Sequence, residues 1–98
     1  MKLDEADRQR LRSICERYGI QRLEVFGSVA RGTATPASDI DLLYSLKPGV
    51  ELGWEIEDLT TELSELFGRP VDLVSRKSIH PLIRSDVLSQ AQDFYAAA

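Results

Sequence analysis

The sequence predicts a small α/β (α+β) domain in which helices pack against a mixed β-sheet. Three longer segments repeat apolar residues with helical spacing, and three shorter segments alternate apolar and polar residues as strands do. Glycine and proline residues separate these segments. The chain has 98 residues and no internal repeat, so we expect residues 1–98 to form one domain with one modest core.

The composition argues against several classes of protein. The net charge is −4, which disfavours a protein that coats nucleic acid through its overall field. Cys15 is the only cysteine, so no internal disulfide can form and a reducing compartment fits. No apolar run approaches the ~20 residues that span a bilayer, and the N-terminus is too acidic for a signal peptide. We therefore expect a cytoplasmic protein that binds neither membranes nor nucleic acid directly.

The first third of the chain predicts a helix, a strand and a turn. Residues 4–18 form an amphipathic helix, which Asp4 can cap and Gly19 can end. Its apolar face consists of Leu11, Ile14, Cys15 and Tyr18. Residues 21–26 alternate through Leu23 and Val25, which indicates a strand. The dipeptide Gly27-Ser28 then turns the chain into a short helix over residues 29–32.

A loop over residues 33–38 leads into the second predicted strand, residues 39–46. Alternation places Ile40, Leu42 and Tyr44 on the core face of that strand and Asp39, Asp41 and Leu43 on the other.

The second half predicts a long helix, a strand and a final helix. Residues 51–67 carry an apolar stripe of Leu52, Ile56, Leu59, Leu63 and Leu66. Residues 71–75 form the third strand, and Pro81 opens the last helix. The inward residues of that helix are Ile83, Val87, Ala91 and Phe94. The predicted order of elements is therefore αβαβαβα.

Three aspartates predict a metal site. Asp39 and Asp41 lie two apart on one strand, so both carboxylates leave the same face with Cβ atoms about 6 to 7 Å apart. Two metal ions in such sites lie about 3.5 to 4 Å apart, within reach of both side chains. Asp72 lies between apolar neighbours in another strand, where a lone buried carboxylate would be costly. If the two strands pair, the three acids converge on Mg²⁺.

The turn before these acids is suited to a phosphate. Gly27 allows the backbone to come close to a phosphate where a Cβ would clash, and Ser28 adds a hydroxyl at a helix N-terminus. Arg31 lies one helical turn further on and could reach the same phosphates or buttress the loop over residues 33–38. Each feature alone is common in purely structural settings. Their combination predicts a site that moves a nucleotide from a nucleoside triphosphate, with metal ions screening the charge.

The spacing from Gly27-Ser28 to Asp39-x-Asp41 resembles the signature of DNA polymerase β-like nucleotidyltransferases. The chain over roughly residues 10–95, with the ending VDLVSRKSIHPLIR, looks like a minimal nucleotidyltransferase domain. The resemblance implies a polymerase β-like palm in which Gly27 and Ser28 hold the triphosphate of ATP. It also implies that Asp39 and Asp41 bind Mg²⁺ and that Asp72 completes the triad.

The resemblance further implies a biological role. Proteins of this group are antitoxins paired with HEPN-domain RNase toxins, and the implied reaction transfers AMP from ATP to a tyrosine hydroxyl of the toxin. The sequence leaves no room for an acceptor domain, so we expect a macromolecular acceptor. Two alternatives remain at this stage: a non-catalytic antitoxin that occludes its toxin, and a nucleotidyltransferase acting on a small molecule.

Two further residues have open roles. Trp54 lies off the apolar stripe of its predicted helix and either lids the core edge or binds a partner. His80 precedes Pro81 at a helix start, where a capping role is favoured over catalysis.

Overall fold

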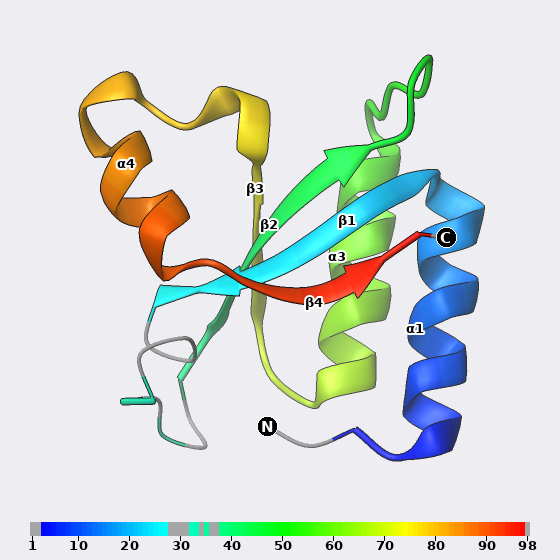
Figure 1. Cartoon of the computed structure of the whole chain (residues 1–98). Helices are drawn as coiled ribbons and strands as arrows, with labels where there is room; N and C mark the ends of the chain where they lie inside the picture. The colour runs from blue at the N-terminus through cyan, green and yellow to red at the C-terminus, as the bar shows by residue number, and fades with distance from the viewer. Residues whose placement is uncertain (1–2, 28–31, 34, 36–37, 98) are drawn as a thin grey trace.

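The computed structural model of the chain describes residues 3–27, 32–33, 35 and 38–97. Figure 1 shows the arrangement of their helices and strands. In chain order these are α1 (Glu5–Tyr18), β1 (Ile20–Phe26), β2 (Ile40–Leu46), α3 (Glu55–Phe67), β3 (Val71–Ser75), the 3₁₀ turn η1 (Arg76–Ser78), α4 (Pro81–Gln90) and β4 (Gln92–Ala96). The expected short helix over residues 29–32 lies largely outside the described residues.

The four strands form one mixed sheet in the order β3-β2-β1-β4. Strand β1 pairs antiparallel with β2 and with β4, whereas β2 and β3 are parallel. A parallel pair needs a crossover connection, and α3 supplies it. The prediction of a small mixed sheet with helices packed against it is thus confirmed.

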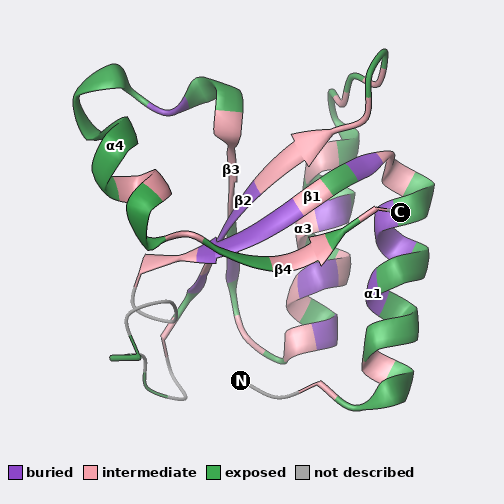
Figure 2. Cartoon of the chain, in the orientation of Figure 1, coloured by how far each residue is buried: buried purple, intermediate pink, exposed green. Residues whose placement is uncertain are grey.

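The main core lies between the sheet and the helices α1 and α3, which lie side by side on one side of the sheet in Figure 1. Its buried members are Leu11, Ile14, Cys15, Ile20, Leu23, Val25, Ile40, Leu42, Leu59, Leu63, Leu66 and Val71. Figure 2 shows buried segments on the strands of the sheet and on α1 and α3. Helix α4, on the other side of the sheet, has no buried residue.

The helix caps follow the sequence. The Asp4 side chain accepts a hydrogen bond from the Asp7 N–H at 2.8 Å, and α1 ends at Gly19 in the left-handed conformation. The His80 Nδ1 accepts from the Leu82 N–H at 3.1 Å, which confirms its predicted capping role at the start of α4.

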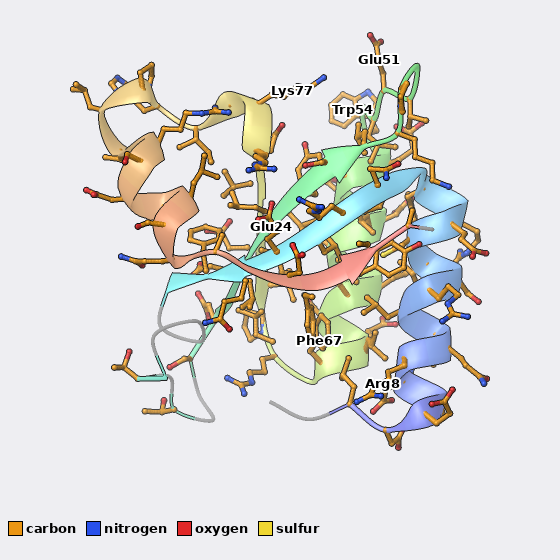
Figure 3. The ribbon with its side chains drawn as sticks, viewed as in Figure 1. Arg8, Glu24, Glu51, Trp54, Phe67 and Lys77 are labelled. Carbon is orange, nitrogen blue, oxygen red and sulfur yellow. The ribbon has the colours of Figure 1, made fainter. Side chains whose placement is uncertain are left out.

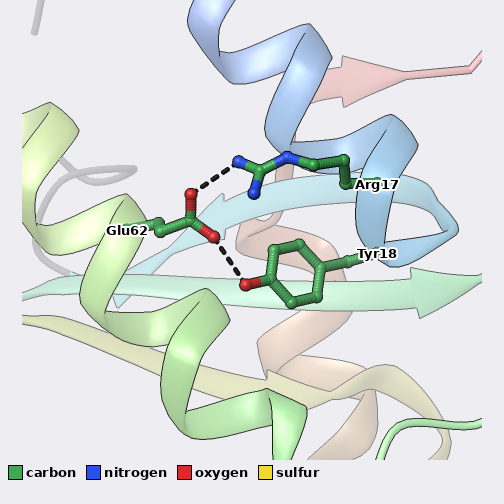
Figure 4. Close-up of polar contacts among 3 residues, drawn as sticks. All are labelled: Arg17, Tyr18 and Glu62. Carbon is green, nitrogen blue, oxygen red and sulfur yellow. Dashed lines mark hydrogen bonds and ion pairs between the residues drawn. The ribbon is translucent and has the colours of Figure 1, made fainter.

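A three-residue polar contact joins α1 to α3 above the core (Figure 4). The Glu62 carboxylate accepts a hydrogen bond from the Tyr18 hydroxyl and one from the Arg17 guanidinium, both at 2.5 Å. These two bonds, the Tyr18 hydroxyl first, lower the pKa of Glu62. The same bond to Glu62 raises the pKa of Tyr18 to about 12.

The C-terminal part of the chain corrects one prediction. The last helix was expected to continue to Phe94, but α4 ends at Gln90 and residues Gln92–Ala96 form strand β4. Strand β1 would otherwise expose an unpaired edge, and Phe94 and Tyr95 are aromatic residues that favour strands. Both aromatic side chains pack against the main core from that strand, and the Phe94 ring lies 5.4 Å from that of Phe67.

Two element boundaries also differ from the expectation. Helix α3 begins at Glu55 rather than at residue 51. Gly53 disfavours helix, and its N–H donates to the Glu55 carboxylate at 2.8 Å, so the chain turns before the helix starts. Leu52 still packs against the core from this turn. Strand β2 begins at Ile40, so Asp39 lies just before it.

No helix in the described part of the chain is long and apolar enough to cross a membrane.

Truncation of a leucine should lower the stability of the protein on one side of the sheet and leave it nearly unchanged on the other. Leu59 is fully buried, so Leu59→Ala removes core contacts and should lower the free energy of unfolding by about 2 to 5 kcal/mol. Leu82 on α4 is 86% exposed, so Leu82→Ala should change it by no more than about 0.5 kcal/mol. Urea denaturation of both variants measures the difference. Equal losses would mean that α4 is packed as tightly as α3.

The α1–α3 contact predicts an acid-dependent contribution to stability. The pKa of Glu62 is lower in the folded protein than its ordinary value of 4.5. The ionised Glu62 carboxylate therefore stabilises the fold at pH values above 4.5, and this stabilisation is lost as the pH falls through the pKa of the folded protein. Thermal unfolding of Glu62→Gln should therefore differ from the parent most near neutral pH, by at most about 4 °C, and the gap should close in acid. A gap that widens in acid would contradict this assignment.

Candidate active site

The two faces of strand β2 differ in chemistry, and this difference creates the site. Ile40 and Leu42 point into the main core, while Asp41 and Leu43 point to the opposite face. That second face also carries Asp72 of β3 and Glu24 of β1, and we call it the acidic face. Leu43 is fully buried there even though it lies outside the main core, so this face is partly covered.

The parallel register brings two of the three predicted acids together. Asp41 of β2 is the register partner of Asp72 of β3. Register partners on neighbouring strands point to the same side, with backbones about 4.8 Å apart. Asp41 is half-buried and Asp72 exposed, so both carboxylates lie at the surface of the sheet. The pairing of these two strands, which the predicted metal site requires, is therefore present.

Gly27 occupies the position beside Asp41, immediately after Phe26, the β1 residue that pairs with Asp41. Its backbone is in the left-handed region at φ +69°, which favours glycine. A Cβ built on Gly27 would overlap the Asp41 carboxylate. The predicted close approach at Gly27 therefore exists, and the group that comes close within the chain itself is a carboxylate.

The third acid is placed differently. Asp39 is exposed and precedes the first paired residue of β2. Across the residues that the structure describes, no three acidic, histidine or cysteine side chains gather closely enough to hold a metal ion. Asp39 lies outside the ladder that fixes Asp41 and Asp72. The predicted nucleotide-binding residues Ser28 and Arg31 lie outside the described residues.

Sequence reasoning missed Glu24, which lies on the acidic face with Asp41 and Asp72. Glu24 alternates with the core residues Leu23 and Val25 along β1 and is only 7% exposed. Its side chain is labelled in Figure 3. Its Oε1 lies 3.6 Å from an Arg76 nitrogen. Neither Glu24 Oε1 nor Arg76 Nε has a hydrogen-bond partner among the described residues. The available signal was alternation along β1. Glu24 lies two residues before Phe26, which is the register partner of Asp41, so Glu24 points to the same face as Asp41.

Three other residues have their roles settled by their surroundings. Cys15 is fully buried, and burial raises the pKa of its thiol to about 12, so it is the inert core residue that was expected. Tyr44 packs against the main core, as predicted. Trp54 is 87% exposed and projects from the segment before α3 (Figure 3), so it does not lid the core.

The chain thus folds as a small α/β domain with two carboxylates aligned on neighbouring parallel strands. The family model described as the nucleotidyltransferase domain matches residues 8–94. The chain therefore belongs to the nucleotidyltransferase domain family, and it is a nucleotidyltransferase by descent and fold.

Curated relatives narrow this description. The chain is 36% identical over 93 residues to MJ0435 of Methanocaldococcus jannaschii, a candidate protein adenylyltransferase by its name. The aligned region covers 95% of this chain and 98% of that relative. It is 39% identical over 75 residues to the protein adenylyltransferase MntA of Thermococcus cleftensis, which covers 76% of this chain and 75% of the relative.

Solved structures give the same fold. A candidate minimal nucleotidyltransferase superposes with a TM-score of 0.73 at 40% identity, covering 91% of this chain and 90% of the other. A toxin–antitoxin complex with AMP-PNP superposes with a TM-score of 0.71 at 21% identity, covering 91% and 73%. A complex of a tri-AMPylated Shewanella oneidensis HEPN toxin with its MNT antitoxin gives 0.65 at 16% identity, covering 97% and 74%. The last two show the fold alone, and the predicted nucleotidyltransferase architecture is confirmed.

The contact between Gly27 and Asp41 predicts a specific loss of activity. Gly27→Ala places a methyl group against the Asp41 carboxylate and should reduce nucleotidyl transfer by at least about 100-fold. Gly49 also has a positive φ, at +82°, but nothing lies within 4 Å of a Cβ built there. Gly49→Ala is thus the matched control, with the same backbone strain and no displaced carboxylate.

The measurement is the rate of AMP incorporation together with the thermal midpoint of each variant. If Gly27→Ala and Gly49→Ala lost activity to the same extent, backbone strain rather than displacement of Asp41 would be the cause of the loss.

Proposed function

We propose that this protein is an antitoxin that transfers AMP from ATP to a tyrosine hydroxyl of a partner HEPN RNase toxin, in a Mg²⁺-dependent reaction. The observation that carries the proposal is the register pairing of Asp41 with Asp72 beside Gly27, on a domain of the nucleotidyltransferase family. The relatives named as protein adenylyltransferases support a protein acceptor. The complex of a HEPN toxin with an MNT antitoxin of the same fold supports the choice of partner, and the toxin–antitoxin complex with AMP-PNP supports an adenine nucleotide as substrate.

The residues present fit a divalent metal. Carboxylate oxygens are the ligands that Mg²⁺ prefers, and Asp41 and Asp72 present them side by side. Gly27 keeps the space next to the Asp41 carboxylate free of a side chain. We assign Asp39, Asp41 and Asp72 as the residues that would hold two Mg²⁺ ions with ATP. Bound Mg²⁺ would screen the triphosphate and stabilise the charge that develops at the α-phosphorus.

The reaction forms one bond and breaks another. The tyrosine oxygen bonds to the α-phosphorus, the bond between the α-phosphorus and the α–β bridging oxygen breaks, and pyrophosphate leaves. Asp72 positions the attacking hydroxyl and accepts its proton. Gly27 and Ser28 hold the β- and γ-phosphates through backbone N–H groups and a hydroxyl, and Arg31 contributes a positive charge. We place this reaction in the cytoplasm, as the sequence predicted.

The central test replaces the metal-binding acids without removing their volume. Asp39→Asn/Asp41→Asn and Asp72→Asn should each reduce AMP transfer by at least about 100-fold, because an amide cannot neutralise a divalent cation. Asp86→Asn, an exposed aspartate on α4, is the matched control and should retain full activity. Each variant is incubated with ATP, Mg²⁺ and the cognate HEPN protein, and the intact mass of that protein is measured.

Each result of this test has a distinct meaning. A gain of one or more AMP masses on the partner with the parent, lost with the acid variants, supports the proposal. If the double variant still silences the toxin fully in cells, neutralisation occurs by occlusion and the enzymatic proposal fails. AMP transfer at a comparable rate to a small molecule with no protein present would move the function to small-molecule modification.

A further inference from the structure

Arg69 lies just before strand β3, which carries Asp72, and it contacts the turn that directly precedes Asp39. It lies in the short connection between α3 and β3. Its Nη1 donates to the Thr35 carbonyl oxygen at 3.1 Å and to the Ser38 carbonyl oxygen at 3.4 Å. The contact joins residues more than 30 positions apart in the sequence.

The turn that Arg69 contacts is itself closed by local hydrogen bonds. The Ser38 N–H donates to the Thr35 carbonyl oxygen at 3.0 Å, and the Thr35 N–H donates to the Ser38 Oγ at 2.9 Å. Because Arg69 contacts both carbonyls, its guanidinium holds Thr35 and Ser38 together and not a single residue. Asp39 follows Ser38 directly, so the position of this turn sets where the Asp39 backbone lies.

A second contact holds the other side of Asp39. The Ile40 N–H donates to the Pro70 carbonyl oxygen at 2.9 Å. The dipeptide Arg69-Pro70 therefore binds the residue before Asp39 and the residue after it. Two residues further along, Asp72 pairs with Asp41. The sheet alone fixes Asp41 and Asp72, whereas Asp39 precedes the paired residues and depends on this bracket.

We propose that Arg69 is a positioning residue for nucleotidyl transfer: its guanidinium fixes the exposed Asp39 relative to the Asp41–Asp72 pair. The proposal rests on the proposed function, since it assigns Asp39 to the metal site. Hydrogen bonds from a charged guanidinium to carbonyl oxygens are stronger than neutral ones, so a single side chain can hold the turn. A displacement of about 1 Å at a reacting centre can cost about 100-fold in rate.

The test separates geometry from charge and from stability. Arg69→Gln removes the charge and the reach, and Arg69→Lys keeps the charge without a guanidinium that reaches both carbonyls. Both variants should lower kcat by about 10- to 100-fold with little change in KM for ATP. Their thermal midpoints should stay within about 4 °C of the parent. Arg17→Gln, which removes a surface arginine contact between α1 and α3, is the matched control and should leave kcat unchanged.

A second readout does not depend on an acceptor. Binding of Mn²⁺ with a non-hydrolysable ATP analogue is measured by electron paramagnetic resonance for the parent, Arg69→Gln, Asp39→Asn and the double variant. If Arg69 acts through Asp39, each single variant weakens Mn²⁺ binding, and Arg69→Gln adds little in the Asp39→Asn background. Additive losses in that cycle would overturn the proposal, as would full restoration of kcat by Arg69→Lys or an unchanged kcat in Arg69→Gln.

The two proposals fail in different ways. Absence of AMP transfer from the parent to its partner, with the non-additive Mn²⁺ binding intact, would overturn the proposed function while supporting the role of Arg69. Normal AMP transfer by the Arg69→Gln variant to the partner would overturn the role of Arg69 while supporting the proposed function.

Discussion

Parallel strands β2 and β3 share one register, which places Asp41 beside Asp72 on one face while Ile40 and Val71 enter the core on the other. Because side chains alternate along a strand, a slip of one residue would turn the carboxylates toward the core. Burying an unpaired carboxylate costs far more than losing one apolar contact. The burial of Ile40, which is fully inaccessible, therefore enforces the position of the acids.

The acidic face separates two kinds of carboxylate. Glu24 is buried and has Arg76 at 3.6 Å as a compensating charge. Asp41 and Asp72 lie nearer the surface and side by side, where both carboxylates can face the same bound cation. The stability that holds them together comes from elsewhere, chiefly from the core under α1 and α3. The site thus depends on packing on the opposite face of the same strands.

Periodicity was sufficient to predict α1, α3 and the first three strands, because each has one apolar face and turn residues at its ends. It failed at Phe94, where an aromatic residue at helical spacing from Val87 belongs to a strand. The partner of that strand, β1, is about 70 residues away, and no local pattern reports such a pairing. Alternation was sufficient to predict that Asp41 leaves the face of its strand opposite to Ile40 and Leu42. The pairing of Asp41 with Asp72, the burial of Glu24 and the contacts of Arg69 were not predictable in this way, because each depends on a distant segment.

The position of β4 in the sheet has a consequence for biosynthesis. Strand β1, which leads into Gly27, has its outer edge covered only by residues 92–96. Residues 92–96 are synthesised after β1 and β2, so the growing polypeptide passes through an interval with that edge bare. Open edges recruit other extended chains. Until residues 92–96 take their place, the nascent protein is therefore vulnerable to wrong pairing along β1.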